Sequence, residues 1–69
     1  MDTFNITTEY IELCQLLKLT GPKLSGGEAK HRILSGEVRV NGLVEHRKKC
    51  KIRPGQTVEF EGFSVRVDS

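Results

Sequence analysis

The stretch "SGGEAKHRILSGEVRVNG", residues 25–42, contains the signals of a capped helix, a strand and a tight turn in direct succession. Ser25 precedes Glu28 by three residues, which is the spacing of a capping box at a helix N-terminus. Gly36 follows the apolar residues of the same segment and suits a left-handed C-cap. The stretch therefore predicts a helix between Ser25 and Gly36, with Ala29 and Ile33 facing the core.

The second half of this stretch predicts a β-hairpin. In "EVRV" two valines alternate with Arg39, so the valines are expected to point inward and Arg39 outward. Asn41-Gly42 is the strongest short hairpin signal in the chain, because a type I′ turn needs two residues at positive φ. The following "LVEH", residues 43–46, is then the returning strand.

Upstream, apolar residues predict a first helix from about Glu9 to Lys18, capped by Thr7 or Thr8. Its expected buried face has the i, i+3, i+4, i+7 spacing. The residues of that face are Tyr10, Leu13, Cys14 and Leu17, with Leu16 beside them. The turn residues of "TGPK", residues 20–23, are expected to end the helix.

Downstream, the chain consists of short strand patterns separated by turns. "TVEF" and "FSVRV" alternate around a Glu61-Gly62 turn, and "RPGQ" supplies another turn before them. Together these elements predict an α+β fold, in which a two-helix hairpin packs on a small, mostly antiparallel sheet. The 69 residues allow a single domain over 1–69 with a thin core.

Positive charge is concentrated in the middle of the chain. Residues 23–53 hold nine Lys and Arg against three Glu, a balance of +6, whereas residues 1–22 and 54–69 each carry −2. Five of the nine residues in "EHRKKCKIR", residues 45–53, are Lys or Arg. From charge alone, this distribution fits either a nucleic-acid site or a solvated face that keeps the protein soluble.

Several other classes of function have little support in the sequence. The start has neither a basic n-region nor an apolar h-region, which favours a cytoplasmic protein with reduced thiols and no membrane contact. A zinc site would need Cys14, His31, His46 and Cys50 together, but only His46 and Cys50 are closely spaced. No catalytic arrangement and no P-loop spacing is present, so we expect no enzyme activity, cofactor or metal.

The order of these motifs resembles a known family. The stretches "ELCQLLKLTG", "SGGEAKHRI", "GEVRVNG" and "RPGQTVEF" follow the pattern of the RNA-binding domain named after small-subunit ribosomal protein S-four, also called the αL motif. The match covers about residues 12–60. Among members of this family, "EVRVNGLVEHRKKCKI" and "GQTVEF" look most like the small stand-alone bacterial YbcJ-type proteins.

This resemblance implies binding of structured RNA, either ribosomal or transfer RNA, through the capped helix and the nearby hairpin loop. A ribosomal subunit is a further implied partner, and a monomer is expected. The resemblance points to Lys30, Arg39, Arg47, Lys48, Lys49 and Lys51 as RNA-binding residues, and we add Arg32, which lies beside the buried face of the same helix as Lys30. Two positions depart from the family pattern, since Gly26 and Glu12 stand where basic residues are common.

The alternative from a different functional class is a protein-interaction adaptor, which could be ribosome-associated. A small helix-and-sheet fold can dock a partner through an open sheet edge. An adaptor of this kind should present an exposed apolar patch, and the sequence does not identify one.

Overall fold

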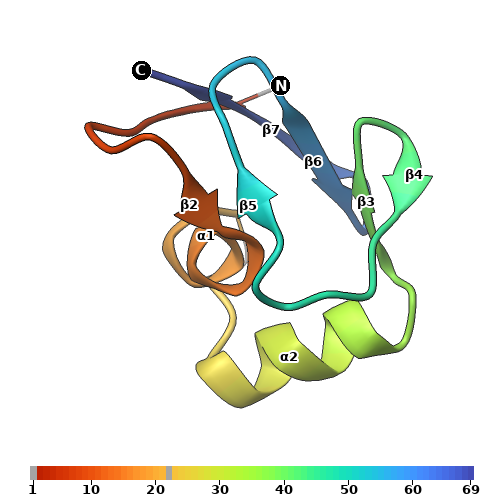
Figure 1. Cartoon of the computed structure of the whole chain (residues 1–69). Coiled ribbons are helices and arrows are strands. Elements are labelled where there is room, and N and C mark those ends of the chain that lie inside the picture. The colour runs from red at the N-terminus through yellow and green to blue at the C-terminus, as the bar shows by residue number, and fades with distance from the viewer. Residues whose placement is uncertain (1, 22) are drawn as a thin grey trace.

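The computed structural model describes residues 2–21 and 23–69 and has an α+β architecture (Figure 1). A five-stranded sheet has the strand order β1-β7-β6-β3-β4, and a separate two-stranded ribbon pairs β2 with β5. The elements in chain order are β1 (Asp2–Asn5), β2 (Ile11–Glu12), α1 (Leu13–Leu19), α2 (Gly26–Leu34), β3 (Val38–Val40), β4 (Leu43–Val44), β5 (Lys51–Ile52), β6 (Thr57–Phe60) and β7 (Phe63–Asp68). No helix within the described part of the chain is long and apolar enough to cross a membrane.

The second helix forms as predicted. The Ser25 hydroxyl accepts a hydrogen bond from the Glu28 N–H at 3.2 Å, which satisfies one of the free donors in the first turn of α2. Gly36 has φ +81°, as expected for a residue that leaves the helix in the left-handed region. Ala29 and Ile33 are fully buried.

The first helix is shorter than predicted, and its cap is different. Residues 9–12 are outside the helix, because Ile11 and Glu12 pair with β5 as strand β2. The Thr8 hydroxyl donates to the Tyr10 carbonyl at 2.8 Å and does not cap α1. The residue at the N-cap is Glu12, whose side chain makes no capping hydrogen bond. Tertiary pairing thus overrides the helical periodicity at this end.

The hairpin turns follow the local signals. Asn41 and Gly42 have φ values of 51° and 84°, as a type I′ turn requires, and the returning strand β4 ends at Val44. The Asn41 side chain also accepts the Thr57 N–H at 2.9 Å, which ties the turn to β6. The predicted sheet is mostly antiparallel as expected, but the N-terminal strand β1, parallel to β7, was not predicted.

One apolar core joins the helices, the sheet and the ribbon. It contains the inward side chains of both helices and the alternate residues of the strands. These residues are Ile6, Leu13, Leu16, Leu17, Ala29, Ile33, Val38, Val40, Ile52, Val58, Phe60, Val65 and Val67. Ile52 is fully buried, so its neighbours in the chain, Lys51 and Arg53, point outward. The core therefore determines that these two basic side chains face solvent.

Candidate nucleic-acid interface

The basic loop, residues 45–50, joins β4 to β5 and is anchored by the start of α1. The first N–H groups of an α-helix have no partner within the helix. Here the N–H of Leu13 donates to the Cys50 carbonyl at 2.9 Å, and that of Cys14 donates to the Lys48 carbonyl at 3.0 Å. The loop backbone therefore does the capping that the Glu12 side chain does not, and this fixes the loop against the helix.

A tight turn and one ion pair shape the basic loop further. The Cys50 N–H donates to the Arg47 carbonyl at 3.1 Å, so Lys48 and Lys49 occupy the middle of the turn. The Glu45 carboxylate accepts hydrogen bonds from the Arg47 backbone N–H and Nε, both at 3.0 Å. These bonds lower the pKa of Glu45 to about 2. The positive charge of Arg47 is therefore already shared with a carboxylate within the loop.

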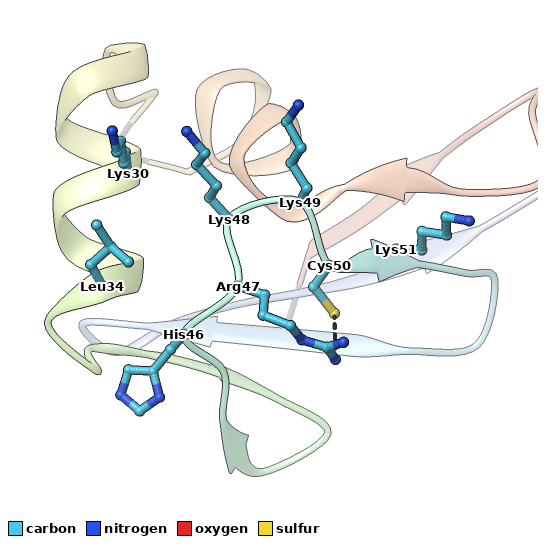
Figure 2. A pocket seen from close by; sticks show the side chains of 8 residues that line it. All are labelled: Lys30, Leu34, His46, Arg47, Lys48, Lys49, Cys50 and Lys51. Atoms are coloured by element: carbon cyan, nitrogen blue, oxygen red, sulfur yellow. Dashed lines mark hydrogen bonds between the residues drawn. The ribbon is translucent and has the colours of Figure 1, made fainter.

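Basic side chains from α2 and the basic loop line one open hollow of about 780 Å³ (Figure 2). Its lining residues are Lys30, Leu34, His46, Arg47, Lys48, Lys49, Cys50 and Lys51. In the view of Figure 2, the side chains of Lys48 and Lys49 extend to the same side of the loop, whereas the Arg47 side chain turns toward Cys50. The hollow thus brings together five of the predicted RNA-binding residues.

No carboxylate among the described residues forms an ion pair with a lysine of this hollow. Within the described residues, Lys30, Lys48, Lys49 and Lys51 make no ion pair, and every ion pair involves an arginine. Lys48 is half-buried, while the other three are exposed. We call these four residues the lysine cluster. Its positive potential is available to an external anion.

Arg32 and Arg39 lie outside the hollow, and their RNA contacts stay predictions. The Arg32 guanidinium is 2.7 Å from Glu37 and 3.2 Å from Glu61, and it lies 5.8 Å over the Phe60 ring. The hydrogen bond to Glu37 raises the pKa of Arg32, because the carboxylate stabilises the charged guanidinium. Arg39 is exposed and lies opposite Glu59 in the pairing of β3 with β6.

His46 and Cys50, the two closely spaced residues of the four considered for a zinc site, have other contacts in the structure. Cys50 is partly buried against the core, and burial raises the pKa of its thiol, with the nearby Glu45 carboxylate adding to the rise. His46 packs near the backbone of Gly36, since a Cβ at that glycine would lie 3.2 Å from its Nε2. Within residues 2–21 and 23–69, no three His, Cys, Asp or Glu side chains form a metal-binding group.

Two aromatic residues differ in their exposure to solvent. Phe63 is the first residue of β7 and directly follows the Glu61-Gly62 turn. Its ring packs partly buried against the backbone of Gly21, where an added Cβ would be 2.7 Å away. Tyr10 was predicted to be in the core, but it precedes β2 and is partly exposed. Its ring has Lys51 Nζ at 5.0 Å and the Arg53 guanidinium carbon at 5.7 Å.

Sequence reasoning missed this grouping of Tyr10 with Arg53 because it depends on the pairing of β2 with β5. Glu12 pairs with Lys51, which is 39 residues later in the chain, and each strand contributes only two paired residues. Strands this short carry no clear alternation pattern.

Comparison with known proteins places these features in a family. The model of the S4 domain matches residues 4–68. The chain belongs to the S4 domain family. This result confirms the family that the motifs indicated, and the S4 match extends beyond residues 12–60 at both ends.

Curated relatives include proteins of similar length. The chain is 53% identical over 68 residues to "Putative RNA-binding protein YbcJ" of Escherichia coli strain K12, and the match covers 97% of each chain. It is 44% identical over 59 residues to "Probable ribosome maturation protein RlbA" of Bacillus subtilis strain 168, covering 86% of this chain and 83% of that relative.

A solved structure supports the same fold. The solution structure of Escherichia coli YbcJ superimposes with a TM-score of 0.75 at 51% identity, covering all of this chain and 89% of the other. That structure is described as revealing an αL motif involved in RNA binding. The predicted α+β fold with an αL motif is thereby confirmed.

Proposed function

We propose that this protein binds structured RNA through the lysine cluster and the basic loop, and that it has no catalytic activity of its own. The observation that carries the proposal is the set of four lysines without carboxylate partners in the described structure, gathered from α2, the basic loop and β5. Lysine ammonium groups bind phosphate oxygens, and the release of condensed counterions adds affinity that does not depend on sequence.

The anchoring of the basic loop supports binding to a folded RNA surface. Its backbone is tied to α1 by two hydrogen bonds, and its turn is closed by a third. A loop held in this way loses little conformational entropy when it binds. Duplex RNA is recognised mainly by its shape and by its phosphate and 2′-hydroxyl groups, so a rigid array of lysines suits it.

The names of the relatives support the same class of ligand. One relative carries the name "Putative RNA-binding protein YbcJ" and another the name "Probable ribosome maturation protein RlbA". We therefore propose ribosomal RNA, or a ribosomal subunit during its assembly, as the first target to test, with transfer RNA as the second.

The experiment is RNA binding measured across a salt series with ribosomal RNA fragments, transfer RNA and a single-stranded control. Four phosphate contacts predict a log–log salt slope of about −3 to −4. The triple variant Lys30→Gln/Lys48→Gln/Lys49→Gln should flatten that slope by about 2 to 3. A single variant, Lys49→Gln, is compared with Arg66→Gln, which removes one positive charge from β7, outside the hollow. Only Lys49→Gln should flatten the salt slope. No binding of the wild type to any RNA at low salt would refute the proposal.

A second candidate, a protein-interaction role alongside RNA binding, has one specific observation in its favour. β4 is an edge strand of the five-stranded sheet, and its two side chains, Leu43 and Val44, are 75% and 47% exposed. Exposed apolar residues on an open edge are the feature that the adaptor hypothesis requires. Loss of ribosomal-subunit association in Leu43→Ser, with binding to isolated RNA unchanged, would support this role.

A further inference from the structure

The outer face of the β2–β5 ribbon carries an aromatic ring and two cations. In the ribbon, Ile11 pairs with Ile52, and Ile52 is fully buried, so these isoleucines define the inner face. Side chains alternate between the faces of a strand. Tyr10, Lys51 and Arg53 therefore point to the other face, where ring–cation distances of 5.0 Å and 5.7 Å place them together. Figure 1 shows the two strands side by side next to α1.

The ring holds these cations without neutralising them. A cation over an aromatic face within about 6 Å is attracted by the ring quadrupole, but all of its N–H donors stay free. In contrast, Arg32, Arg47 and Arg66 each donate to a carboxylate. Arg53 makes no ion pair with any described residue, and its guanidinium can form two parallel hydrogen bonds to one phosphate.

The ribbon face is continuous with the proposed RNA site. Lys51 lines the hollow of the lysine cluster and also lies over the Tyr10 ring. One residue thus belongs to both surfaces. A phosphate backbone that follows the lysines of the basic loop to Lys51 would next reach Arg53.

One carboxylate on the same face opposes this arrangement. Glu12 lies directly opposite Lys51 in the ribbon, although the two side chains form no ion pair in the described structure. Its negative charge lowers the local potential beside Lys51. Arg53 follows Lys51 by two residues and is farther along the ribbon from Glu12, so it is less affected by that charge.

We propose that Tyr10 and Arg53 extend the RNA site along the β2–β5 ribbon, with Arg53 binding a backbone phosphate and Tyr10 positioning Arg53 and Lys51 for that contact. This inference rests on the proposed function, and it adds two residues to the site. The ligand is the ribose–phosphate backbone, not a stacked base, because two cations already lie against the Tyr10 ring, at 5.0 Å and 5.7 Å from its centroid.

The test compares variants with the full chain in the same salt series, using the RNA that the wild type binds most tightly. Arg53→Gln should flatten the log–log slope by about 0.7 to 0.9, so its affinity deficit should shrink about threefold between 50 and 200 mM salt. Arg66→Gln, the matched loss of one charge on β7, should leave the slope unchanged. Equal slopes in both variants would overturn the assignment of Arg53.

Tyr10 needs a test that separates positioning from folding. Tyr10→Leu should weaken binding severalfold with little change in slope, because no charge is removed, and Tyr10→Phe should restore wild-type binding because the ring is kept. Equal binding by Tyr10→Leu and the wild type would overturn the positioning role.

Glu12→Gln removes the opposing charge without removing a capping bond, and it should strengthen binding.

These outcomes separate the two proposals. If the wild type binds RNA and the variants of Tyr10, Arg53 and Glu12 all behave like it, the ribbon face is outside the site while the lysine cluster stands. If the wild type binds no RNA at low salt, the proposed function itself fails.

Discussion

Two glycine-to-alanine substitutions should change stability in opposite directions. Gly42 has φ +84° in the β3–β4 turn, whereas Gly27 lies in the first turn of α2. A Cβ built at either position meets no heavy atom within 4 Å, so neither substitution creates a clash or a new contact. The sign of each effect is therefore set by the backbone alone.

The magnitudes follow from the two conformations. An L-residue in the left-handed region costs about 1–2 kcal/mol, so Gly42→Ala should destabilise the protein by that amount. Gly27→Ala is placed where alanine fits without strain, and it should stabilise the protein by about 0.4–1 kcal/mol through lower entropy of the unfolded chain. In a domain of this size, about 1 kcal/mol shifts Tm by roughly 4–8 °C.

Thermal and urea unfolding of the two variants and the wild type measure the difference. We expect a lower Tm for Gly42→Ala and a higher Tm for Gly27→Ala, with the urea m-value unchanged in both. Gly42→Val should be worse than Gly42→Ala, because a β-branched residue resists positive φ more strongly. A shift of the same sign in both alanine variants would refute the reasoning, as would an unchanged Tm in Gly42→Ala.

Three further predictions concern contacts around the site. Because hydrogen bonds from Arg47 hold the pKa of Glu45 at about 2, the stability they add is present above pH 4.5 and lost as the pH falls toward 2. The stability difference between the wild type and Glu45→Gln should therefore shrink over that range in urea titrations at several pH values, and a constant difference would contradict it. Arg32→Gln should lower Tm while leaving the salt slope of RNA binding unchanged, since Arg32 is paired with two carboxylates; a flatter slope would instead confirm it as an RNA contact. Ser25→Ala should cost about 1 kcal/mol through loss of the cap and Ser25→Gly only a few tenths, so equal losses in urea unfolding would argue against capping.

Elements whose signals are local could be predicted from the sequence. The Ser25 cap, the left-handed Gly36 and the Asn41-Gly42 turn depend on residues within three or four positions of each other, and all three occur as expected. Each signal reflects a backbone requirement that few residue types meet. The capped helix therefore has nearly the predicted bounds, and the first hairpin has the predicted turn, although its returning strand ends at Val44 and not at residue 46.

Elements that depend on distant partners were not predicted. β1 forms only because β7, more than 60 residues later, offers a parallel edge. The sequence predicts a first helix that starts about four residues too early, because Tyr10 has the right spacing for the buried face of a helix. The pairing of Ile11 with Ile52 competes with that helix and wins, since it buries Ile52 fully and lets the basic loop cap α1.

The same distinction applies to the candidate site. The run of basic residues is visible in the sequence, and its members do gather with Lys30 in one hollow. The sequence does not show which charges are already paired, because that depends on side-chain geometry. Arg32 and Arg47 count equally with the lysines in a tally of charge, yet both are bonded to carboxylates.

The difference between paired arginines and unpaired lysines in the described structure has a physical basis. The planar guanidinium of arginine matches a carboxylate with two parallel donors, so arginine forms the intramolecular ion pairs that fix the α2 end and the basic loop. The lysine ammonium is compact and strongly hydrated, and it gains less from such a pair on an exposed surface. Lysines therefore keep their charge available, and Arg53 joins them because its neighbour is an aromatic ring and not a carboxylate. Around the hollow, the Arg47–Glu45 pair shapes the basic loop, while the lysines and Arg53, which form no ion pair in the described structure, present the charge that suits a fixed array of phosphates.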